Sequence, residues 1–240
     1  MKIVLIGYGK MGKTIERIAL ERGHEIVCIV DVENRQDFES EAFRSADAAI
    51  EFTAPSVAVD NYHRAFAAGV PVVSGTTGWT AALPALRAEI EHNGNTLFWA
   101  SNFSIGVNVF LAANKYLARL MNSFSEYNVS MTEIHHTQKL DAPSGTAVTL
   151  AEGILENLKR KTVWIKDEEK SADELSIKSI REGQVAGIHT VTYESASDSI
   201  IFTHDAKNRE GFALGAVLAA EFIVGKKGFF GMEDLLKIDL

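Results

Sequence analysis

The feature that most constrains the fold is an alternation of short β-rich runs with helical patterns in the first half of the chain. The β-rich runs lie near residues 2–6, 25–31, 48–53, 70–74 and 96–100. Between them, residues 11–22, 57–68 and 81–92 carry helix formers with apolar residues at helical spacing. Strands that alternate with helices form βαβ units, so this half predicts a parallel sheet of the α/β class. Residues 33–45 are short and polar, so we expect the second crossover to lack a full helix.

A glycine-rich loop follows the first predicted strand directly and opens the first predicted helix. Its residues are Gly7, Tyr8, Gly9, Lys10, Met11 and Gly12. This is the context that the G-x-G-x-x-G dinucleotide-binding motif requires. The first glycine permits a tight turn, the second lets the backbone approach a pyrophosphate, and the third allows close helix packing, with the phosphates at the positive end of the helix. The loop therefore predicts a dinucleotide site, and the alternative is a glycine-rich connection without a ligand.

Asp31 bears on the choice of cofactor. It ends the second predicted strand about 20 residues beyond the glycine loop, where an acid hydrogen-bonds the ribose hydroxyl of NAD. The 2′-phosphate of NADP is repelled by a carboxylate unless cations intervene, and Lys10 and Arg35 are candidates for that role. The sequence therefore favours NADH and leaves NADPH open.

Small or polar residues also stand at the ends of later predicted strands. Ligands in open α/β sheets bind outside the carboxyl ends of the strands, so these segments are candidates for further cofactor contacts. Ordinary turn chemistry is the alternative for each of them. The segments are residues 52–55, 75–78 and 100–104.

Beyond residue 104 the pattern changes. A long helical run at 107–121 leads into a strand-like segment at 127–136 and a helix at 146–159. The later strand candidates suggest an antiparallel sheet, unlike the first half. They lie at 176–182, 187–195 and 199–205.

The end of the chain completes the domain assignment. A last apolar helix is predicted at 212–224, and the charged run 166–174 is interpreted as a solvated surface loop. We therefore predict a dinucleotide-binding domain of residues 1–104 plus 217–240 and a second domain of residues 105–216.

Composition narrows the class of protein and its partners. A chain of 240 residues that is 46% hydrophobic can bury a substantial core. The apolar N-terminal segment is too short for a signal peptide or membrane span, and the single Cys28 cannot form an internal disulfide, so we expect a cytoplasmic protein without a membrane partner. A net charge of −8 and a pI near 5.4 argue against nucleic acid as a partner. An anionic substrate would therefore need a local cluster of basic groups.

The most informative segment is EIHHTQKLDAPSGTA, residues 133–147. It places His135, His136 and Lys139 just before a predicted helix start. The Pro-Ser-Gly-Thr turn leaves backbone N–H groups at that start, which suit a carboxylate. Lys139 adds a compact positive charge and a proton donor, and the histidines titrate near physiological pH. The segment therefore predicts a site that binds an anion and protonates it.

Two structural alternatives concern the same histidines. Adjacent strand residues point to opposite faces, so His135 or His136 could simply pack while the other works. Glu133, His135 and His136 are also close in sequence, but neighbouring strand positions do not converge on one ion. No metal is therefore predicted.

Three later residues carry weaker signals. Arg209, before the last helix, is interpreted equally as a ligand of a substrate carboxylate or as a residue that stabilises the domain junction. His189 and His204 lie in strand patterns and are interpreted as structural residues of a sheet.

Residues 133–147 resemble the signature of the 4-hydroxy-tetrahydrodipicolinate reductases, also called dihydrodipicolinate reductases. The resemblance extends over nearly the whole chain, through GYGKMG, EFTAPS, VVSGTTGW, ASNFSIGVN, REGQVAGIHTV and NREGFALGA. It implies an NADH- or NADPH-dependent oxidoreductase of lysine and diaminopimelate biosynthesis. The expected reaction is the reduction of 4-hydroxy-tetrahydrodipicolinate, a small cyclic dicarboxylate, to tetrahydrodipicolinate.

The resemblance also implies an architecture and roles for single residues. The family has a Rossmann-type domain, a smaller α+β domain with an open mixed sheet for substrate binding and oligomerisation, and commonly a homotetramer. His135 would be the catalytic acid/base and Lys139 a proton donor, and His136, Gly145 and Thr146 would bind substrate. The cofactor would be bound by Gly7, Tyr8, Gly9, Lys10, Met11, Gly12, Asp31, Gly75, Thr76, Thr77, Ala100, Ser101, Asn102 and Phe103.

The chain departs from the family pattern in shorter segments after Asp31 and near residues 166–182, which leaves the adenine-side contacts and some loops open. Two other functions share part of this sequence pattern. Another two-domain nicotinamide dehydrogenase would share the glycine loop but would not need residues 133–147. A non-catalytic dinucleotide sensor could lose His135 and Lys139 without penalty, so their joint presence favours the reductase.

Overall fold

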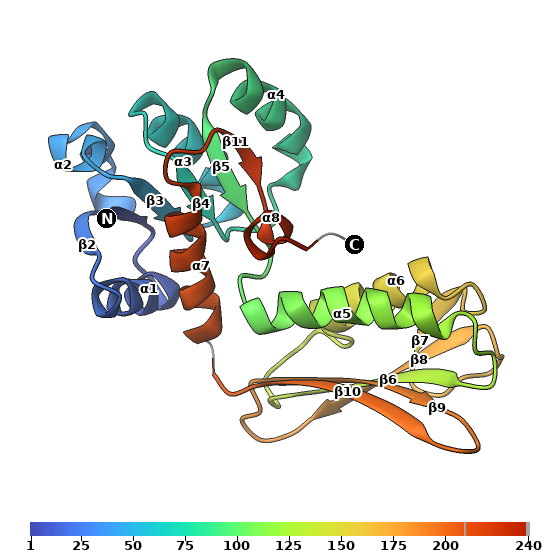
Figure 1. Ribbon diagram of the computed structural model, residues 1–240. Coiled ribbons are helices and arrows are strands. Elements are labelled where there is room, and N and C mark those ends of the chain that lie inside the picture. The colour runs from blue at the N-terminus through green and yellow to red at the C-terminus, as the bar shows by residue number, and fades with distance from the viewer. Residues whose placement is uncertain (209, 239–240) are drawn as a thin grey trace. The chain divides into compact units, whose positions relative to one another are not determined.

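The computed structural model describes residues 1–208 and 210–238, which fall into two compact units (Figure 1). Of the described residues, 1–105 and 210–238 form the first unit, and residues 106–208 belong to the second. The chain thus returns to the first unit at the start of helix α7 (Glu210–Ile223), not inside it at residue 217. The reason is that α7 is one continuous helix whose buried side chains pack in the core of the first unit. Arg209 lies outside the described residues.

The first unit is built on a six-stranded parallel sheet with the order β11-β5-β4-β3-β1-β2. This confirms the predicted Rossmann-type sheet. The strand β11 was not predicted, because its three residues begin with glycine and are too few to show a strand pattern. The strands are β1 (Lys2–Ile6), β2 (Glu25–Val30), β3 (Ala48–Glu51), β4 (Val72–Ser74), β5 (Thr96–Trp99) and β11 (Gly228–Phe230).

Helices cover both faces of this sheet, because successive residues of a strand point to opposite sides. On β1, Ile3 and Leu5 pack in one core with α1 and α7, and Val4 and Ile6 pack in the other with α3 and α4. The second crossover has only short turns of helix, as expected from its polar sequence. The helical elements are α1 (Lys10–Glu21), η1 (Val32–Glu39), α2 (Glu41–Arg44), α3 (Pro55–Ala67), η2 (Thr80–Ala82), α4 (Leu83–Asn93), α7 and α8 (Met232–Leu236).

The second unit has a five-stranded sheet with the order β10-β9-β6-β8-β7. Strands β6, β8 and β7 are parallel, and β9 and β10 are antiparallel to their neighbours. The segment 176–182 is therefore parallel to β6 and not antiparallel, because α6 carries the chain back before β7, and β7 and β8 then both run in the direction of β6. The mixed sheet that the resemblance implied is confirmed. The strands are β6 (Asn128–His135), β7 (Val163–Lys166), β8 (Glu174–Arg181), β9 (Gly187–Glu194) and β10 (Ser199–Ala206).

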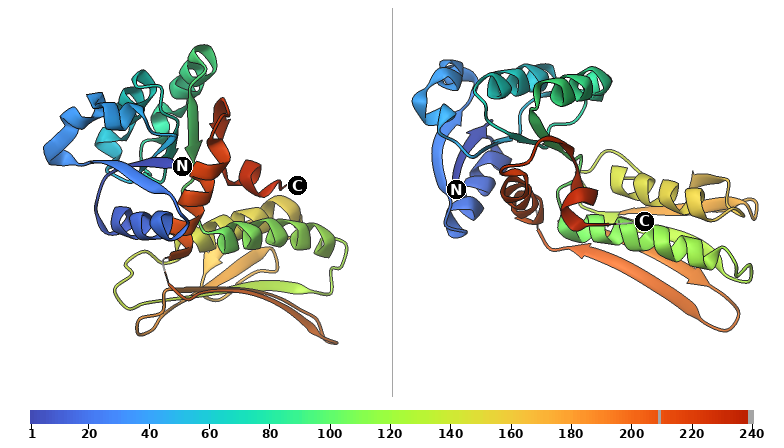
Figure 2. Two further views of the ribbon diagram at one scale, coloured as in Figure 1. Left: turned by 60° about the vertical axis from the view of Figure 1, so that its left-hand side comes forward. Right: turned by 45° about the horizontal axis from the view of Figure 1, so that its top comes forward.

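Helices α5 (Ile105–Met121) and α6 (Gly145–Asn157) cover one face of this second sheet (Figures 1 and 2). Alternate residues of β6 are buried on that face, and Glu133 and His135 are among them. The residues between them point to the other face, which we call the open face. Its side chains include Ser130, Thr132, Ile134, Thr190, Thr192, Ile201 and Thr203.

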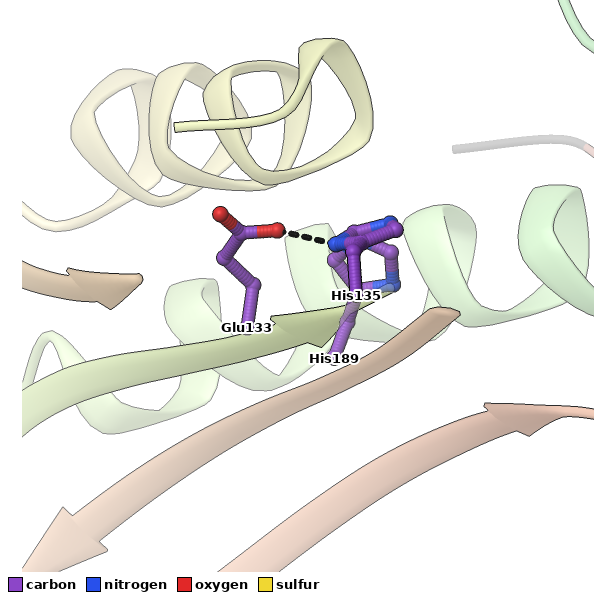
Figure 3. Close-up of side chains that lie close together, drawn as sticks. All are labelled: Glu133, His135 and His189. Carbon is purple, nitrogen blue, oxygen red and sulfur yellow. Dashed lines mark ion pairs between the residues drawn. The ribbon is translucent and has the colours of Figure 1, made fainter. Parts of the chain in front are cut away.

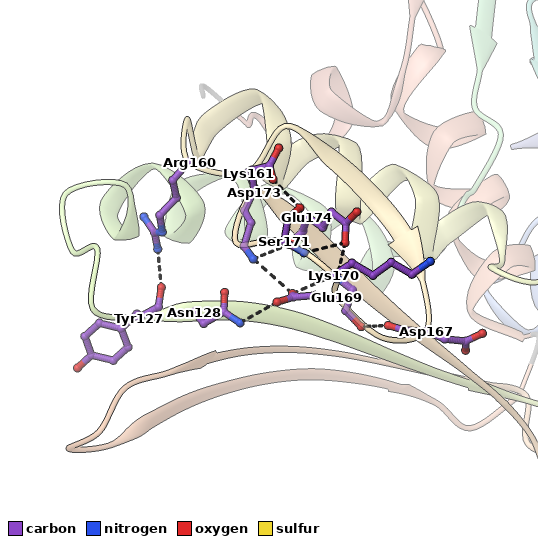
Figure 4. Close-up of polar contacts among 11 residues, drawn as sticks. Tyr127, Asn128, Arg160, Lys161, Asp167, Glu169, Lys170, Ser171, Asp173 and Glu174 are labelled. Atoms are coloured by element: carbon purple, nitrogen blue, oxygen red, sulfur yellow. Dashed lines mark hydrogen bonds and ion pairs between the residues drawn. The ribbon is translucent and has the colours of Figure 1, made fainter.

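Most of the charged run 166–174 is exposed, as expected of a solvated surface segment, but Glu169 and Glu174 anchor it to a buried lysine (Figure 4). Lys161 is 2% exposed, and its Nζ lies 3.3 Å from Oε1 of Glu169 and donates to the carbonyl oxygen of Glu174. Asn128 Nδ2 donates to the other oxygen of Glu169, at 3.2 Å. A buried ammonium requires such partners, so the run folds back over the sheet. No helix among the described residues is both long and apolar enough to cross a membrane.

Candidate active site

The glycine loop has the geometry of a phosphate cradle. Gly7 has φ +91°, and a Cβ there would collide with the carbonyl oxygen of Phe52. A Cβ at Gly12 would collide with the carbonyl oxygen of Gly7. At Gly9, a Cβ would meet no heavy atom of the described residues within 4 Å. The first and third glycines are therefore required for packing, and the second leaves open space in front of the helix.

This open space is the mouth of a pocket in the first unit. Helix α1 starts at this pocket with Lys10, Met11 and Gly12, so the first N–H groups, at the positive end of the helix, lie beside the pocket. The first turn carries no acidic side chain that would compete with a bound anion for these groups. The pocket has a volume of about 400 Å³. It is lined by Gly9, Lys10, Met11, Gly12, Phe52, Thr53, Pro55, Gly75, Thr76 and Thr77. These residues fit a dinucleotide, because the backbone amides at the start of α1 lie in the same pocket as the residues that follow two strands of the sheet.

The other predicted cofactor residues lie outside this lining. Asp31 follows β2, and its carboxylate accepts hydrogen bonds from the backbone N–H groups of Tyr8, at 3.3 Å, and Val32, at 2.9 Å. It therefore lies beside the glycine loop. The segment from Ala100 to Phe103 follows β5. The Phe103 ring is buried, and its centroid lies 5.8 Å from the centroid of the Phe52 ring. Phe103 is 2% exposed and packs in the core of the first unit, so the predicted cofactor contact at this position is not brought to the pocket.

A buried carboxylate organises the two strand ends behind the pocket. Ser74 Oγ donates to Oε2 of Glu51 at 2.6 Å, and Thr76 Oγ1 donates to Oε1 at 3.0 Å. Thr53 also donates to Glu51, and Tyr62 and Ser74 share a hydrogen bond of 2.6 Å. Burial raises the pKa of Tyr62. This network was not predicted from the sequence, although an acidic residue at the end of an apolar strand was the available signal.

In the second unit, the end of β6 carries an ion-pair network. Glu133 is 1% exposed, and its Oε2 contacts Nδ1 of His135 on the same face of the strand (Figure 3). Its Oε1 lies 2.9 Å from the guanidinium of Arg181 on the neighbouring strand β8. Arg181 was not predicted as a functional residue, because only the pairing of β8 with β6 brings it to this position.

Burial and charge set the protonation states of this pair. Burial opposes ionisation of Glu133, but the Ser179 hydroxyl, the Arg181 guanidinium and His135 together outweigh it and hold the pKa of Glu133 below its usual value. Burial is also the largest influence on His135 and lowers its pKa, although Glu133 raises it and Lys139 lowers it further. At neutral pH the pair is therefore a carboxylate and a neutral imidazole.

His189 connects this pair to the start of α6. Its ring packs edge-on against the His135 ring, with 5.1 Å between centroids, and its Nε2 lies 3.1 Å from Oγ of Ser144. Burial lowers the pKa of His189 to about 4, so its imidazole is neutral. Ser144 is the N-cap of α6, where its Oγ accepts a hydrogen bond from the Ala147 N–H at 3.3 Å. His189 is a residue of the sheet, as interpreted from the sequence, and it also contacts the turn that begins α6.

The start of α6 is open, as the Pro-Ser-Gly-Thr turn predicted. A Cβ at Gly145 would meet no heavy atom within 4 Å among the described residues. The first N–H groups of a helix have no partner within the helix, and here they belong to Gly145 and Thr146. His136, half-buried, follows directly after the end of β6.

Lys139 lies in the loop between β6 and α6. Its Nζ is 2.8 Å from Oδ1 of Asp141, and this hydrogen-bonded ion pair lowers the pKa of Asp141. Arg181 donates to the carbonyl oxygens of both Lys139, at 3.3 Å, and Asp141. One guanidinium therefore holds the lysine loop and the buried Glu133 together.

The same cluster has a spacing that a metal ion could bridge. One ligand atom each of Glu133, His135 and His189 lies within 4.8 Å of the others. The absence of a metal was expected from a different set, Glu133, His135 and His136, in which His136 stood in place of His189. Arg181 against Glu133, and the charge of Lys139 nearby, oppose the addition of a cation. We therefore interpret the cluster as an acid–base network.

Comparison with known proteins gives consistent results for both units. A family model described as the N-terminus of dihydrodipicolinate reductase matches residues 1–103, and one described as its C-terminus matches residues 106–236. The 4-hydroxy-tetrahydrodipicolinate reductase of Christiangramia forsetii is 48% identical over 240 residues, which cover 98% of each chain. That of Desulfovibrio desulfuricans is 36% identical over 259 residues, which cover 97% of this chain and 98% of the relative.

A solved structure has the same fold. The dipicolinate-bound dihydrodipicolinate reductase from Paenisporosarcina sp. TG-14 aligns with a TM-score of 0.79 at 24% identity, over 98% of both chains.

Proposed function

Because the chain belongs to the dihydrodipicolinate reductase family, we propose that it reduces 4-hydroxy-tetrahydrodipicolinate to tetrahydrodipicolinate, with His135 and Lys139 as the residues that move protons. It is an oxidoreductase of lysine and diaminopimelate biosynthesis. The observation that carries the assignment of roles is the folding of residues 133–147. They bring a neutral imidazole, an ammonium and an open helix start into one site of the second unit.

The substrate carries two carboxylates, and the second unit offers groups of opposite charge. The N–H groups of Gly145 and Thr146 lie at the positive end of α6 and bind one carboxylate. Lys139 contributes a positive charge in the adjoining loop, where Asp141 is its present partner. A substrate carboxylate therefore competes with Asp141 for Lys139. His136 contributes a half-buried imidazole at the edge of the same turn.

Proton transfer is assigned to the two residues according to their protonation states. Lys139 has three N–H donors and delivers the proton to the ring atom that gains electron density. His135 is neutral and has one basic nitrogen, so it accepts or relays a proton. The backbone amides and Lys139 also stabilise negative charge that develops on the substrate.

The cofactor is NADH in preference to NADPH. When bound, the nicotinamide supplies the hydride, and the chain holds the pyrophosphate with the amides of Gly9 to Gly12. Asp31 lies beside the glycine loop, where a carboxylate accepts from a ribose hydroxyl and repels a 2′-phosphate. Arg35, a cation that could offset this repulsion, is paired instead with Asp60 at 2.6 Å. These contacts support NADH, with NADPH as a weaker donor.

We also propose that the enzyme is a cytoplasmic homotetramer assembled through the open face of the second sheet. That face consists largely of threonine and isoleucine side chains, and Ile201 on the edge strand β10 is 64% exposed. A flat, weakly polar sheet face of this kind suits packing against a second copy.

The decisive experiment mixes purified protein with freshly generated 4-hydroxy-tetrahydrodipicolinate and follows oxidation of NADH and, separately, NADPH. Substrate-dependent oxidation is expected with both, faster with NADH. Lys139→Ala should lower kcat/KM by about 100-fold or more, because a positioned proton donor contributes about 10²- to 10⁴-fold. Lys159→Ala, at an exposed position after α6, is the matched control.

Lack of oxidation with either cofactor, from folded protein that binds dinucleotide, would defeat the proposal. The chain would then be another two-domain nicotinamide dehydrogenase or a non-catalytic dinucleotide sensor.

A further inference from the structure

The proposed reaction does not by itself explain why a carboxylate, that of Glu133, is buried in the second sheet. It is 1% exposed, and it contacts both His135 and Arg181 inside the second unit. Burying a carboxylate is costly unless it is paired, and one cation would suffice for that. The second contact, to an imidazole whose pKa is lowered by burial, therefore points to a role for Glu133 in the state of His135.

The chemistry of the contact defines the tautomer of His135. An ionised carboxylate only accepts hydrogen bonds, and a neutral imidazole has one N–H and one acceptor nitrogen. Because Nδ1 faces Glu133, the N–H is on Nδ1 and the lone pair is on Nε2. Histidine tautomers are commonly set in this way by the partner of the other nitrogen.

The space beside Nε2 depends on a glycine. Gly187, the first residue of β9, lies directly beside it, and a Cβ at that position would be only 3.0 Å from Nε2. Any larger side chain there would crowd the nitrogen. The glycine therefore keeps open the side of the imidazole that Glu133 does not occupy.

We propose that Glu133 is a positioning residue for the reduction, whose carboxylate fixes His135 as the Nδ1–H tautomer and presents Nε2 as the proton-transferring atom. Arg181 keeps Glu133 ionised and, through the carbonyl oxygens of Lys139 and Asp141, holds the proton-donor loop in register with it. The inference rests on the proposed function and adds a residue that does not touch the substrate.

The charged and titratable groups that face His135 are Glu133 from its own strand, Arg181 from β8, His189 from β9 and Lys139 from the following loop. Of these, only Glu133 raises the pKa of His135, whereas Lys139 and Arg181 lower it. One limb of the pH profile reflects the titration of His135. Removal of the Glu133 charge must therefore shift that limb to lower pH. A merely structural ion pair between Glu133 and Arg181 would leave the kcat of the folded variant unchanged.

The test compares wild type, Glu133→Gln and Glu194→Gln in steady-state kinetics across pH. Glu133→Gln retains the shape of the side chain but loses the charge, and Glu194, exposed at the end of β9, is the matched control. The expected result is a kcat about 10- to 100-fold lower, a part of what acid–base catalysis contributes. KM should stay within about threefold, and the His135 limb should shift to lower pH. Unchanged kcat and an unchanged limb would overturn the inference.

A second measurement needs neither a variant of Glu133 nor turnover. Nitrogen-15 NMR of histidine-labelled wild type, assigned with His135→Asn, should show a protonated Nδ1 and an unprotonated Nε2 for His135 at neutral pH. The opposite tautomer would refute the inference even if Glu133→Gln fails to fold. Absence of reductase activity in wild type would count against the proposed function alone, because the tautomer does not depend on it.

Discussion

Single carboxylates are buried in both units, and they are compensated differently. Glu51 accepts hydrogen bonds from three hydroxyl groups, among them Ser74 at 2.6 Å, whereas Glu133 contacts the guanidinium of Arg181. Hydroxyl donors hold a carboxylate through directional hydrogen bonds, whereas a guanidinium also places a fixed positive charge beside it. Glu51 is therefore suited to holding strand ends in place, and Glu133 to electrostatic control of a neighbour.

This difference leads to a prediction for Glu51. Glu51→Ala should reduce the free energy of unfolding by about 3 kcal/mol, because Ser74 and Thr76 each lose a buried acceptor at about 1–3 kcal/mol. Glu51→Gln, which still accepts hydrogen bonds, should cost less. Urea unfolding monitored by circular dichroism measures both, with Glu91→Ala on the exposed side of α4 as control. Equal stability of Glu51→Ala and the control would contradict the prediction.

At the same scale, the sequence predicted His135 and Lys139 but not their partners. The predicted residues lie within one short segment, where spacing and resemblance are informative. Arg181 and His189 reach the site only through strand pairing, in which His135 is opposite Arg181 and Glu133 is opposite His189. Such registers join residues far apart in the chain, and the periodicity of a single strand does not specify them.

At the scale of elements, the glycine loop and α1 show how a short motif combines folding with binding. Gly7 and Gly12 meet surrounding backbone atoms, whereas Gly9 faces open space. The two packing positions are determined by the strand–turn–helix geometry, and the open one by the ligand. This is why the motif was predictable in its proper context between a strand and a helix.

Substitutions in the loop should separate these roles. Gly9→Ala should leave the free energy of unfolding within about 1 kcal/mol of wild type, because the residue has φ −77° and no close neighbour. Its affinity for NADH should fall at least tenfold (about 1.4 kcal/mol), because the methyl group enters the space of the pyrophosphate. Gly12→Ala should instead destabilise the fold. Calorimetric titration and urea unfolding distinguish the two, and unimpaired NADH binding by Gly9→Ala would refute this division.

The longer elements were predicted more successfully than the short ones. Strands of the first sheet and the long helices have enough residues to show periodicity, and their limits differ by a few residues at most. Strands β7 and β11 were missed. They have four and three residues, and they exist because a neighbouring strand offers a free edge. That influence is tertiary and leaves no local pattern.

At the scale of the whole molecule, the open face of the second sheet remains to be covered. Its side chains are mostly hydroxyl-bearing and β-branched, and β10 is an edge strand. Threonine and isoleucine favour sheets and pack well against another sheet. The tetramer proposed above would bury this face.

Thr192→Arg places a charge in the middle of that face and should dissociate the assembly. Light scattering coupled to size-exclusion chromatography should give the mass of a tetramer for wild type and a smaller mass for the variant, because a buried unpaired guanidinium is costly. Ser123→Arg, at an exposed turn after α5, serves as control. The same mass for wild type and both variants would place the interface elsewhere or exclude an assembly.

The return of the chain to its first unit has a consequence for synthesis on the ribosome. Residues 106–208 are made in full before α7 and β11, yet these two elements complete the core and the sheet edge of the first unit. Domains tend to fold as units while the chain emerges. Here the first unit, whose synthesis begins first, completes its folding last. The nascent glycine loop is exposed beside an incomplete core until the final residues are made. A stop codon just before Glu210 would therefore eliminate the cofactor-binding unit, although every residue that lines its pocket has already been translated.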